Sequence, residues 1–207
     1  MGRWVYRQLR LGAGQGVGAA RERCGCLAQG WNFFTHFLDS PEQGLLVFVL
    51  FTDVHPRGGG TFIACDSVGP VARYLAAHPE GVNPSELPGK EWIRECHDFR
   101  ETTGRAGDVF LVHPYLLHTS SYNHRPEARL MINPPVRLRE PMRFDRRADG
   151  SAYSAVELAV LRALGVRHCD FQPAGPRLMV VPPRVTMQTK LVEKVNRVFR
   201  RIAHRRR

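Results

Sequence analysis

The sequence feature that most constrains the fold is the stretch at residues 107–129, GDVFLVHPYLLHTSSYNHRPEAR. It begins as an apolar strand, bends tightly, and continues as a second strand that carries His118. Arg129 follows eleven residues after His118 and opens a further predicted strand. The stretch therefore predicts a β-rich fold in which a histidine and an arginine stand on successive strands.

Short strands are predicted along most of the chain, at residues 31–37, 45–52, 61–64, 98–102, 108–113, 116–121 and 129–136. A helix is predicted at 67–78, capped by Ser67, and another at 154–164, with a capping box at Ser154 and a stop at Gly165. Residues 79–91, rich in Pro and Gly, are predicted to be a loop. Many short strands without βαβ alternation predict a mainly β antiparallel barrel or sandwich with peripheral helices.

Length and charge narrow the possible classes of protein. A chain of 207 residues suits one domain with a sizeable core. Its longest apolar run, residues 45–51, fits a buried strand and is far shorter than the roughly 18 residues of a membrane span. The net charge of +11 comes from the two ends, because residues 1–38 carry +4, residues 184–207 carry +8, and residues 39–183 carry −1. A basic surface over the whole protein is therefore not predicted.

The cysteines and the N-terminus bear on the compartment. Five cysteines are an odd number, and they are scattered without a secretory context, which indicates reduced intracellular thiols. The first 21 residues hold several arginines and no acid, as transit peptides do, but they contain little serine, and the Gly-rich stretch 11–20 makes a poor helix. We expect a cytoplasmic protein, with a mitochondrial location as the alternative.

Composition divides the chain into three segments: an irregular Arg/Gly-rich segment at 1–30, a folded domain at 31–184, and a basic amphipathic helix and tail at 185–207. In the last segment Leu191, Val195, Val198 and Ile202 recur at helical spacing, with basic residues elsewhere on the wheel. Such a helix could bind an anionic membrane surface or nucleic acid. We favour a helix that packs on the domain by its apolar face, with a solvated basic tail.

His118 and Arg129 are the residues best suited to chemistry. Non-haem iron oxygenases hold their metal with two histidines and one carboxylate, which leaves positions open for 2-oxoglutarate and oxygen. The first histidine and the carboxylate usually stand as His-x-Asp on a strand, where residues i and i+2 point to the same side. A later strand supplies the second histidine, and a basic residue binds the far carboxylate of 2-oxoglutarate. An arginine directed into a barrel needs an anion, although both residues could instead be structural or exposed.

Five segments carry a family resemblance: FFTHFLDSPEQGLLVFVLFTD, PRGGGTFIACDSV, VARYLAAHPEGV, GDVFLVHPYLLHTSSYNH followed by Arg129, and SAVELAVLRALG. In this order they resemble the phytanoyl-CoA dioxygenase family of iron(II)/2-oxoglutarate oxygenases, over residues 31–184. The resemblance implies a double-stranded β-helix (jelly roll, cupin-like), with His118 as an iron(II) ligand and Arg129 as the 2-oxoglutarate-binding residue. It also implies hydroxylation of a small organic substrate, with release of succinate and carbon dioxide. His113 matches no ligand position and is expected to line the barrel or lie at the surface.

The sequence departs from this family at the other half of the iron site. The family pattern is Trp-His-x-Asp-Gly-x-Phe, whereas this chain continues from Trp31 directly into Asn32, Phe33 and Phe34, as if its N-terminal part were shortened or altered. Three substitute pairs are His36 with Asp39, Asp53 with His55, and His168 with Asp170. The first would face opposite sides of a strand, the second ends the wrong strand, and the third lies beyond Arg129.

Two other functions therefore stay open. One is a catalytically inactive pseudoenzyme or fragment that keeps the shell of the family, since a single protein ligand holds iron poorly. The other is a binder of anionic surfaces through residues 190–207. The predicted partners are 2-oxoglutarate and a small-molecule substrate, and nucleic acid or a membrane surface is not favoured.

Overall fold

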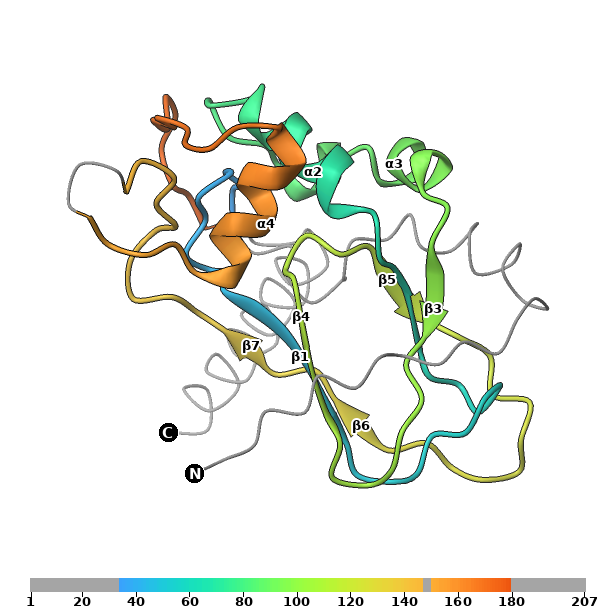
Figure 1. The fold of residues 1–207 in the computed structure, drawn as a ribbon. Helices are drawn as coiled ribbons and strands as arrows, with labels where there is room; N and C mark the ends of the chain where they lie inside the picture. The colour runs from blue at the N-terminus through green and yellow to red at the C-terminus, as the bar shows by residue number, and fades with distance from the viewer. Residues whose placement is uncertain (1–33, 147–149, 180–207) are drawn as a thin grey trace, which may run out of the picture.

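The computed structural model describes residues 34–146 and 150–179. Two small antiparallel sheets face each other, and the α-helices gather at one end of them (Figure 1). This arrangement agrees with the expectation of a mainly β fold with helices. The predicted segments 1–30 and 185–207 lie outside the described residues, as does the junction of Trp31 with Asn32, so the predictions made for them stay predictions.

The first sheet, called here the β1 sheet, is built around β1 (Leu45–Leu50). β1 pairs with β4 (Val109–Val112) on one side, and with β6 (Met131–Ile132) and β7 (Pro135–Val136) on the other. Every side chain of β1 is apolar, because this strand lies in the middle of the sheet with neighbours on both edges. The strand that was predicted from the apolar run is confirmed.

The second sheet, called here the β2 sheet, has β2 (Thr61–Ala64) at its centre, between β3 (Phe99–Glu101) and β5 (His118–Ser120). Ile63 lies opposite His118 on β5, so both side chains leave the sheet on the same face. That face looks toward the β1 sheet, since Ile63 shares a buried cluster with side chains of β1 and β4: Leu46, Phe48 and Val112. The space between the sheets is called here the two-sheet interior.

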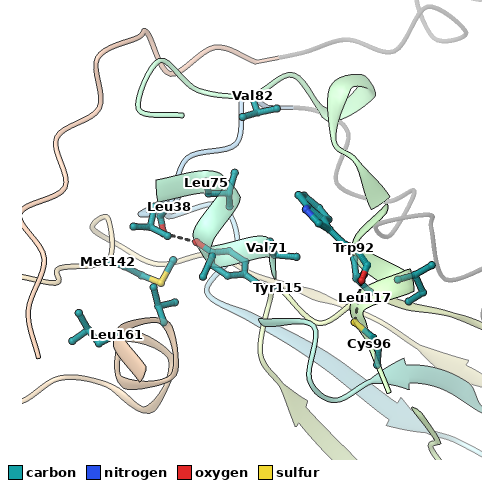
Figure 2. Close-up of a cluster of buried hydrophobic side chains, with 14 of the residues drawn as sticks. Leu38, Val71, Leu75, Val82, Trp92, Cys96, Tyr115, Leu117, Met142 and Leu161 are labelled. Atoms are coloured by element: carbon teal, nitrogen blue, oxygen red, sulfur yellow. Dashed lines mark hydrogen bonds between the residues drawn. The ribbon is translucent and has the colours of Figure 1, made fainter. Parts of the chain in front are cut away.

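Three α-helices and a short 3-10 helix complete the described fold: α2 (Val68–Ala76), η1 (Pro84–Glu86), α3 (Gly89–Glu95) and α4 (Ala155–Leu164). The α-helices enclose the larger core, called here the helix core (Figure 2). It includes Leu38, Val71, Leu75, Val82, Trp92, Cys96, Tyr115, Leu117, Met142 and Leu161. Tyr115 is fully enclosed there, and its hydroxyl donates a hydrogen bond to the Leu38 carbonyl (Figure 2).

Of the two predicted helix caps, one is confirmed and the other is wrong. At α4 the capping box is confirmed, because Ser154 Oγ accepts from the Glu157 amide at 3.2 Å, and Gly165 ends the helix with φ of 71°. At α2 the capping role of Ser67 is wrong. Its hydroxyl instead donates to the Ala64 carbonyl at 2.7 Å and accepts from the Leu117 amide at 2.8 Å.

Two other predictions need correction. Residues 79–91 were predicted to be a loop, but η1 and the start of α3 lie there. The predicted strand at 31–37 is reduced, in its described part, to isolated bridges of Phe34 with Met179 and of His36 with Val82. Within residues 34–146 and 150–179, no helix combines the length and apolar character needed to cross a membrane.

Candidate functional site

His118 lies on β5 in the two-sheet interior and is only 8% exposed. Its Nδ1 is 2.9 Å from the Leu116 carbonyl oxygen, and a carbonyl can only accept, so Nδ1 carries the proton. Nε2 then carries the lone pair. No hydrogen-bond partner for Nε2 exists among the residues that the structure describes.

The surroundings keep this imidazole neutral. Burial lowers the pKa of His118, against a smaller opposing effect of the hydrogen bond to the Leu116 carbonyl. The ring of Phe48, from the facing sheet, lies with its centroid 5.7 Å away. A neutral imidazole whose Nδ1–H is held by a backbone carbonyl presents Nε2 as a ligand atom, which is the usual arrangement of metal-binding histidines.

Arg129 approaches the same interior from the other side. It stands two residues before Met131 of β6, and its Nη1 is 2.9 Å from the Met131 sulfur. That sulfur also accepts from Thr61 Oγ1 at 3.5 Å, and Met131 packs on the cluster between the sheets. A thioether is a weak acceptor, so this contact compensates a guanidinium poorly.

The charge of Arg129 is left without a close anion. Burial lowers the pKa of Arg129, and the more distant carboxylate of Glu101 offsets this in part. Within the described part of the chain, no carboxylate oxygen comes within 4.0 Å of the guanidinium. A half-buried arginine in this state is short of a partner.

β2 connects the two predicted site residues. Ile63 lies opposite His118, and Thr61, two positions earlier on the same face, reaches Met131 and through it Arg129. Positions i and i+2 of a strand are about 7 Å apart. The structure thus brings His118 and Arg129 to one interior, from facing sheets.

Arg129 also borders a small surface pocket formed by the loops after β1 and before β6. The pocket encloses about 180 Å³ of empty space, part of it open solvent, and is lined by Asp53, His55, Gly58, Arg125, Glu127, Ala128 and Arg129. Three of its charged groups already have partners, because Asp53 Oδ1 accepts from the Ala106 amide at 2.8 Å and Arg125 Nε lies 3.3 Å from the carboxylate of Glu127. The substitute pair Asp53 and His55 therefore lies beside Arg129 on the surface.

The other substitute pairs lie elsewhere. Asp39 is buried on the helix side, where its Oδ2 pairs with Arg177 at 2.5 Å, and His36 pairs through its backbone with Val82. His168 and Asp170 follow α4; Asp170 accepts from Gln172 at 2.8 Å. Across residues 34–146 and 150–179, no group of three or more His, Cys, Asp or Glu side chains is placed to hold a metal ion.

These observations test the fit of iron(II) and of 2-oxoglutarate separately. Iron(II) needs three protein ligands on one face, and His118 is the single well-oriented one in the described part of the chain. The described residues therefore do not fit an iron site by themselves. A carboxylate fits better, because Arg129 offers a guanidinium without a close anion.

His113 was expected to line the barrel or lie at the surface, and it is half-buried beside α4. Its Nδ1 accepts from the Tyr115 amide at 3.1 Å, and its Nε2 lies 3.2 Å from the Val156 carbonyl of α4. Burial lowers the pKa of His113 to about 4, although the hydrogen bond to Val156 opposes this. His113 thus ties the turn between β4 and β5 to α4.

Arg100 was not predicted as a site residue, but it lies opposite Ile63 and so shares the face of His118. Its Nε and Nη2 donate to the two carboxylate oxygens of Asp98 at 3.0 and 3.1 Å, so an acidic side chain already balances this cation. The alternation of side chains along β3 was the sequence signal that could have placed Arg100 on this face.

The site can be stated from its geometry alone: a neutral, oriented imidazole and a poorly compensated guanidinium reach one interior from two facing sheets. This combination can hold a small anion, and it supplies one nitrogen ligand beside it. Comparison of the chain with protein-family models, with curated proteins and with solved structures found no match.

Proposed function

We propose that this chain is an oxygenase-like protein that binds 2-oxoglutarate, or a dicarboxylate of the same shape, through Arg129 in the two-sheet interior. The observation that carries the proposal is the state of this arginine: half-buried, with a thioether as its hydrogen-bond acceptor and no carboxylate within 4.0 Å in the described part of the chain. A bound carboxylate would supply the missing charge through two parallel hydrogen bonds.

The proposed scaffold is a jelly roll, and strand order supports it. The chain passes from the β1 sheet to the β2 sheet and back twice, since β1, β4 and β6 belong to one sheet and β2, β3 and β5 to the other. Repeated passage between two facing antiparallel sheets is typical of jelly rolls. The segments that resemble phytanoyl-CoA dioxygenases agree with this proposal.

The experiment is calorimetric titration of the full chain with 2-oxoglutarate. We expect Arg129→Gln to weaken binding at least tenfold, because the variant loses the charge and the paired donors. Arg125→Gln is the matched control, since Arg125 lines the same surface pocket but is already paired with Glu127, and its affinity should change less than twofold. Failure of the wild type to bind, or equal losses in both variants, would refute the proposal.

A second candidate is an active iron(II)-dependent hydroxylase of a small organic substrate, and the orientation of His118 favours it. Two further ligands would have to come from residues outside the described ranges. Anaerobic loading with iron(II) and 2-oxoglutarate, followed by exposure to air, tests this candidate by succinate release. Release that disappears in His118→Ala would establish the hydroxylase, whereas 2-oxoglutarate binding without succinate would establish the binding role alone.

A further inference from the structure

The face of the β1 sheet that points away from the β2 sheet is apolar; its side chains on the flanking strands are exposed, while Val47 at its centre is only 8% exposed. Val109 and Leu111 of β4 are 54% and 53% exposed, and Ile132 of β6 is 47% exposed. Strand register places them together, because Val49 of β1 lies opposite both Val109 and Ile132, and Val47 lies opposite Leu111.

Two more large side chains extend this face at the end of β1. Phe51 is 53% exposed and Leu130 is 58% exposed, and the Phe51 amide donates to the Leu130 carbonyl at 2.9 Å. The outer face of the β2 sheet differs, because Ala64 and Phe62 of β2 and Phe99 of β3 pack on the helix core. A contiguous apolar face of this size on a sheet usually marks a contact surface.

We propose that residues 190–207 of the same chain cover this face as an amphipathic helix. Its apolar stripe of Leu191, Val195, Val198 and Ile202 would lie along β1, between the exposed side chains of β4 and β6. The helix would leave its lysines and arginines in water.

The dimensions agree. The stripe from Leu191 to Ile202 is about 16 Å long in a helix, and the six residues of β1 extend about 20 Å. A helix about 10 Å across matches the width of β4, β1 and β6, whose neighbours are about 4.8 Å apart. One helix is therefore enough to cover the exposed residues.

The chain can also reach this face. The last described residue, Met179, is 72% exposed and pairs with Phe34. Residues 180–189 then provide ten residues of connection, which span up to about 33 Å when extended. A domain of about 150 residues has a radius of gyration near 15 Å, so the connection reaches either side of the sheets.

The composition of the two ends favours the C-terminal segment as the occupant. The N-terminal stretch 11–20 is Gly-rich and lacks a continuous apolar stripe, whereas residues 190–207 repeat apolar side chains at helical spacing. Docking of this stripe also accounts for the +8 charge of residues 184–207 without nucleic acid, because the basic residues are then the solvated side of a packed helix.

Photo-crosslinking of the full chain tests the contact directly. p-Benzoylphenylalanine is placed at position 111, and at position 158 of α4 as the control, where Leu158 is also exposed. We expect position 111, and not position 158, to cross-link to residues 190–207 of the same molecule, which a mixture of light and heavy isotope-labelled protein distinguishes from a second copy. Cross-links from position 111 to residues 1–33 or to a second copy, or none at all, would overturn the proposal.

Limited trypsin digestion gives an independent measurement. If the stripe is docked, Val198→Ser should speed cleavage within residues 190–207 at least fivefold, whereas Asn196→Ser, which lies off the stripe and is not a trypsin site, should not. Leu111→Ser, on the sheet side, should speed the same cleavage. Equal rates in the wild type and in both Val198→Ser and Leu111→Ser would contradict docking, as would protection that appears only with anionic phosphatidylserine vesicles.

Discussion

The helix core buries many more apolar side chains than the two-sheet interior, and the interior holds the two candidate site residues. Fifteen buried residues form the helix core, against four in the cluster between the sheets, so most of the apolar burial lies on the helix side. In the helix core the hydroxyl of Tyr115 donates to the Leu38 carbonyl, although two buried atoms on the same side, Asp39 Oδ1 and Arg146 Nε, have no hydrogen-bond partner among the described residues. In the interior, His118 Nε2 lacks a described partner and Arg129 has a poor one. Stability is thus concentrated in one region, and the capacity to bind in the other.

The largest expected loss of stability comes from a large-to-small substitution in the helix core. Tyr115→Ala removes a fully enclosed ring and leaves the Leu38 carbonyl without its donor. It should lower the free energy of unfolding by about 4 kcal/mol, as large-to-small substitutions in cores do. Tyr122→Ala, at a side chain that is 52% exposed, is the control and should cost less than about 0.5 kcal/mol. Urea denaturation of both variants checks the contrast, and similar losses would contradict it.

The second effect is a loss of stability in acid. The pKa of His113 falls from its usual 6.5 to about 4 in the folded state, so between these values the unfolded chain binds a proton that the folded chain excludes. Stability should be fully present above pH 6.5 and decline as the pH falls toward 4, by up to about 3 kcal/mol from His113. His118, whose pKa is also lowered, adds in the same direction.

Melting temperatures measured from pH 7 to pH 4 test this effect. Protonation at Nδ1 of His113 would place a hydrogen against the Tyr115 amide, which donates to that atom. His113→Asn keeps an acceptor but does not titrate, so its stability should depend less on pH. A wild-type protein whose stability is constant down to pH 4 would rule out the burial of these imidazoles.

Much of the fold followed from local sequence, and the exceptions have a physical pattern. β1 and α4 were predicted because an apolar run and a capping box are strong local signals. α3 was missed because it begins at Gly89, after a proline, without a side-chain cap. Burial of Trp92 and Ile93 in the helix core stabilises it instead, and that tertiary contribution is invisible in the sequence.

Ser154 caps α4, whereas Ser67 makes tertiary hydrogen bonds, and alanine substitutions test this difference. Ser154→Ala should cost about 1 kcal/mol, the usual value of a cap. Ser67→Ala should cost about 2 kcal/mol, because it leaves the buried Leu117 amide without an acceptor.

Substitution of each serine by aspartate is a further test, because aspartate is also a good helix cap. Ser154→Asp should keep nearly full stability, whereas Ser67→Asp buries a charge at a fully enclosed position and should destabilise strongly. Equal tolerance of aspartate at both positions would mean that Ser67 is a cap after all. Thermal unfolding of the four variants is sufficient.

The candidate site was also predictable only in part, because local patterns are visible in the sequence and contacts between distant residues are not. Both His118 and Arg129 were predicted on strands, with side chains that alternate from face to face; His118 lies on β5, Arg129 lies two residues before β6, and the structure brings them to one interior. The pairing of Asp39 with Arg177 joins residues 138 positions apart, and no local pattern indicates such a pair. The remaining iron ligands were not found in the sequence, and the described residues add none.

The smallest effect on stability is expected at Arg129, and it is the most informative. Without ligand, Arg129→Leu should change the free energy of unfolding by less than about 1 kcal/mol, since the lost contact is to a weak thioether acceptor. With 2-oxoglutarate at a hundredfold excess over its dissociation constant, the wild type should gain about 2.7 kcal/mol and the variant nothing.

Arg146→Leu provides the contrast on the helix side. Arg146 Nη2 lies 2.9 Å from the carboxylate of Glu157, whose side chain is only 3% exposed, so its removal leaves a buried charge less compensated and should cost about 3 kcal/mol. Arg146 then stabilises the fold, whereas Arg129 is available to bind an anion. If Arg129→Leu proved as destabilising as Arg146→Leu in the absence of ligand, Arg129 would be a structural residue, and the interior would be no more specialised for binding than the helix core.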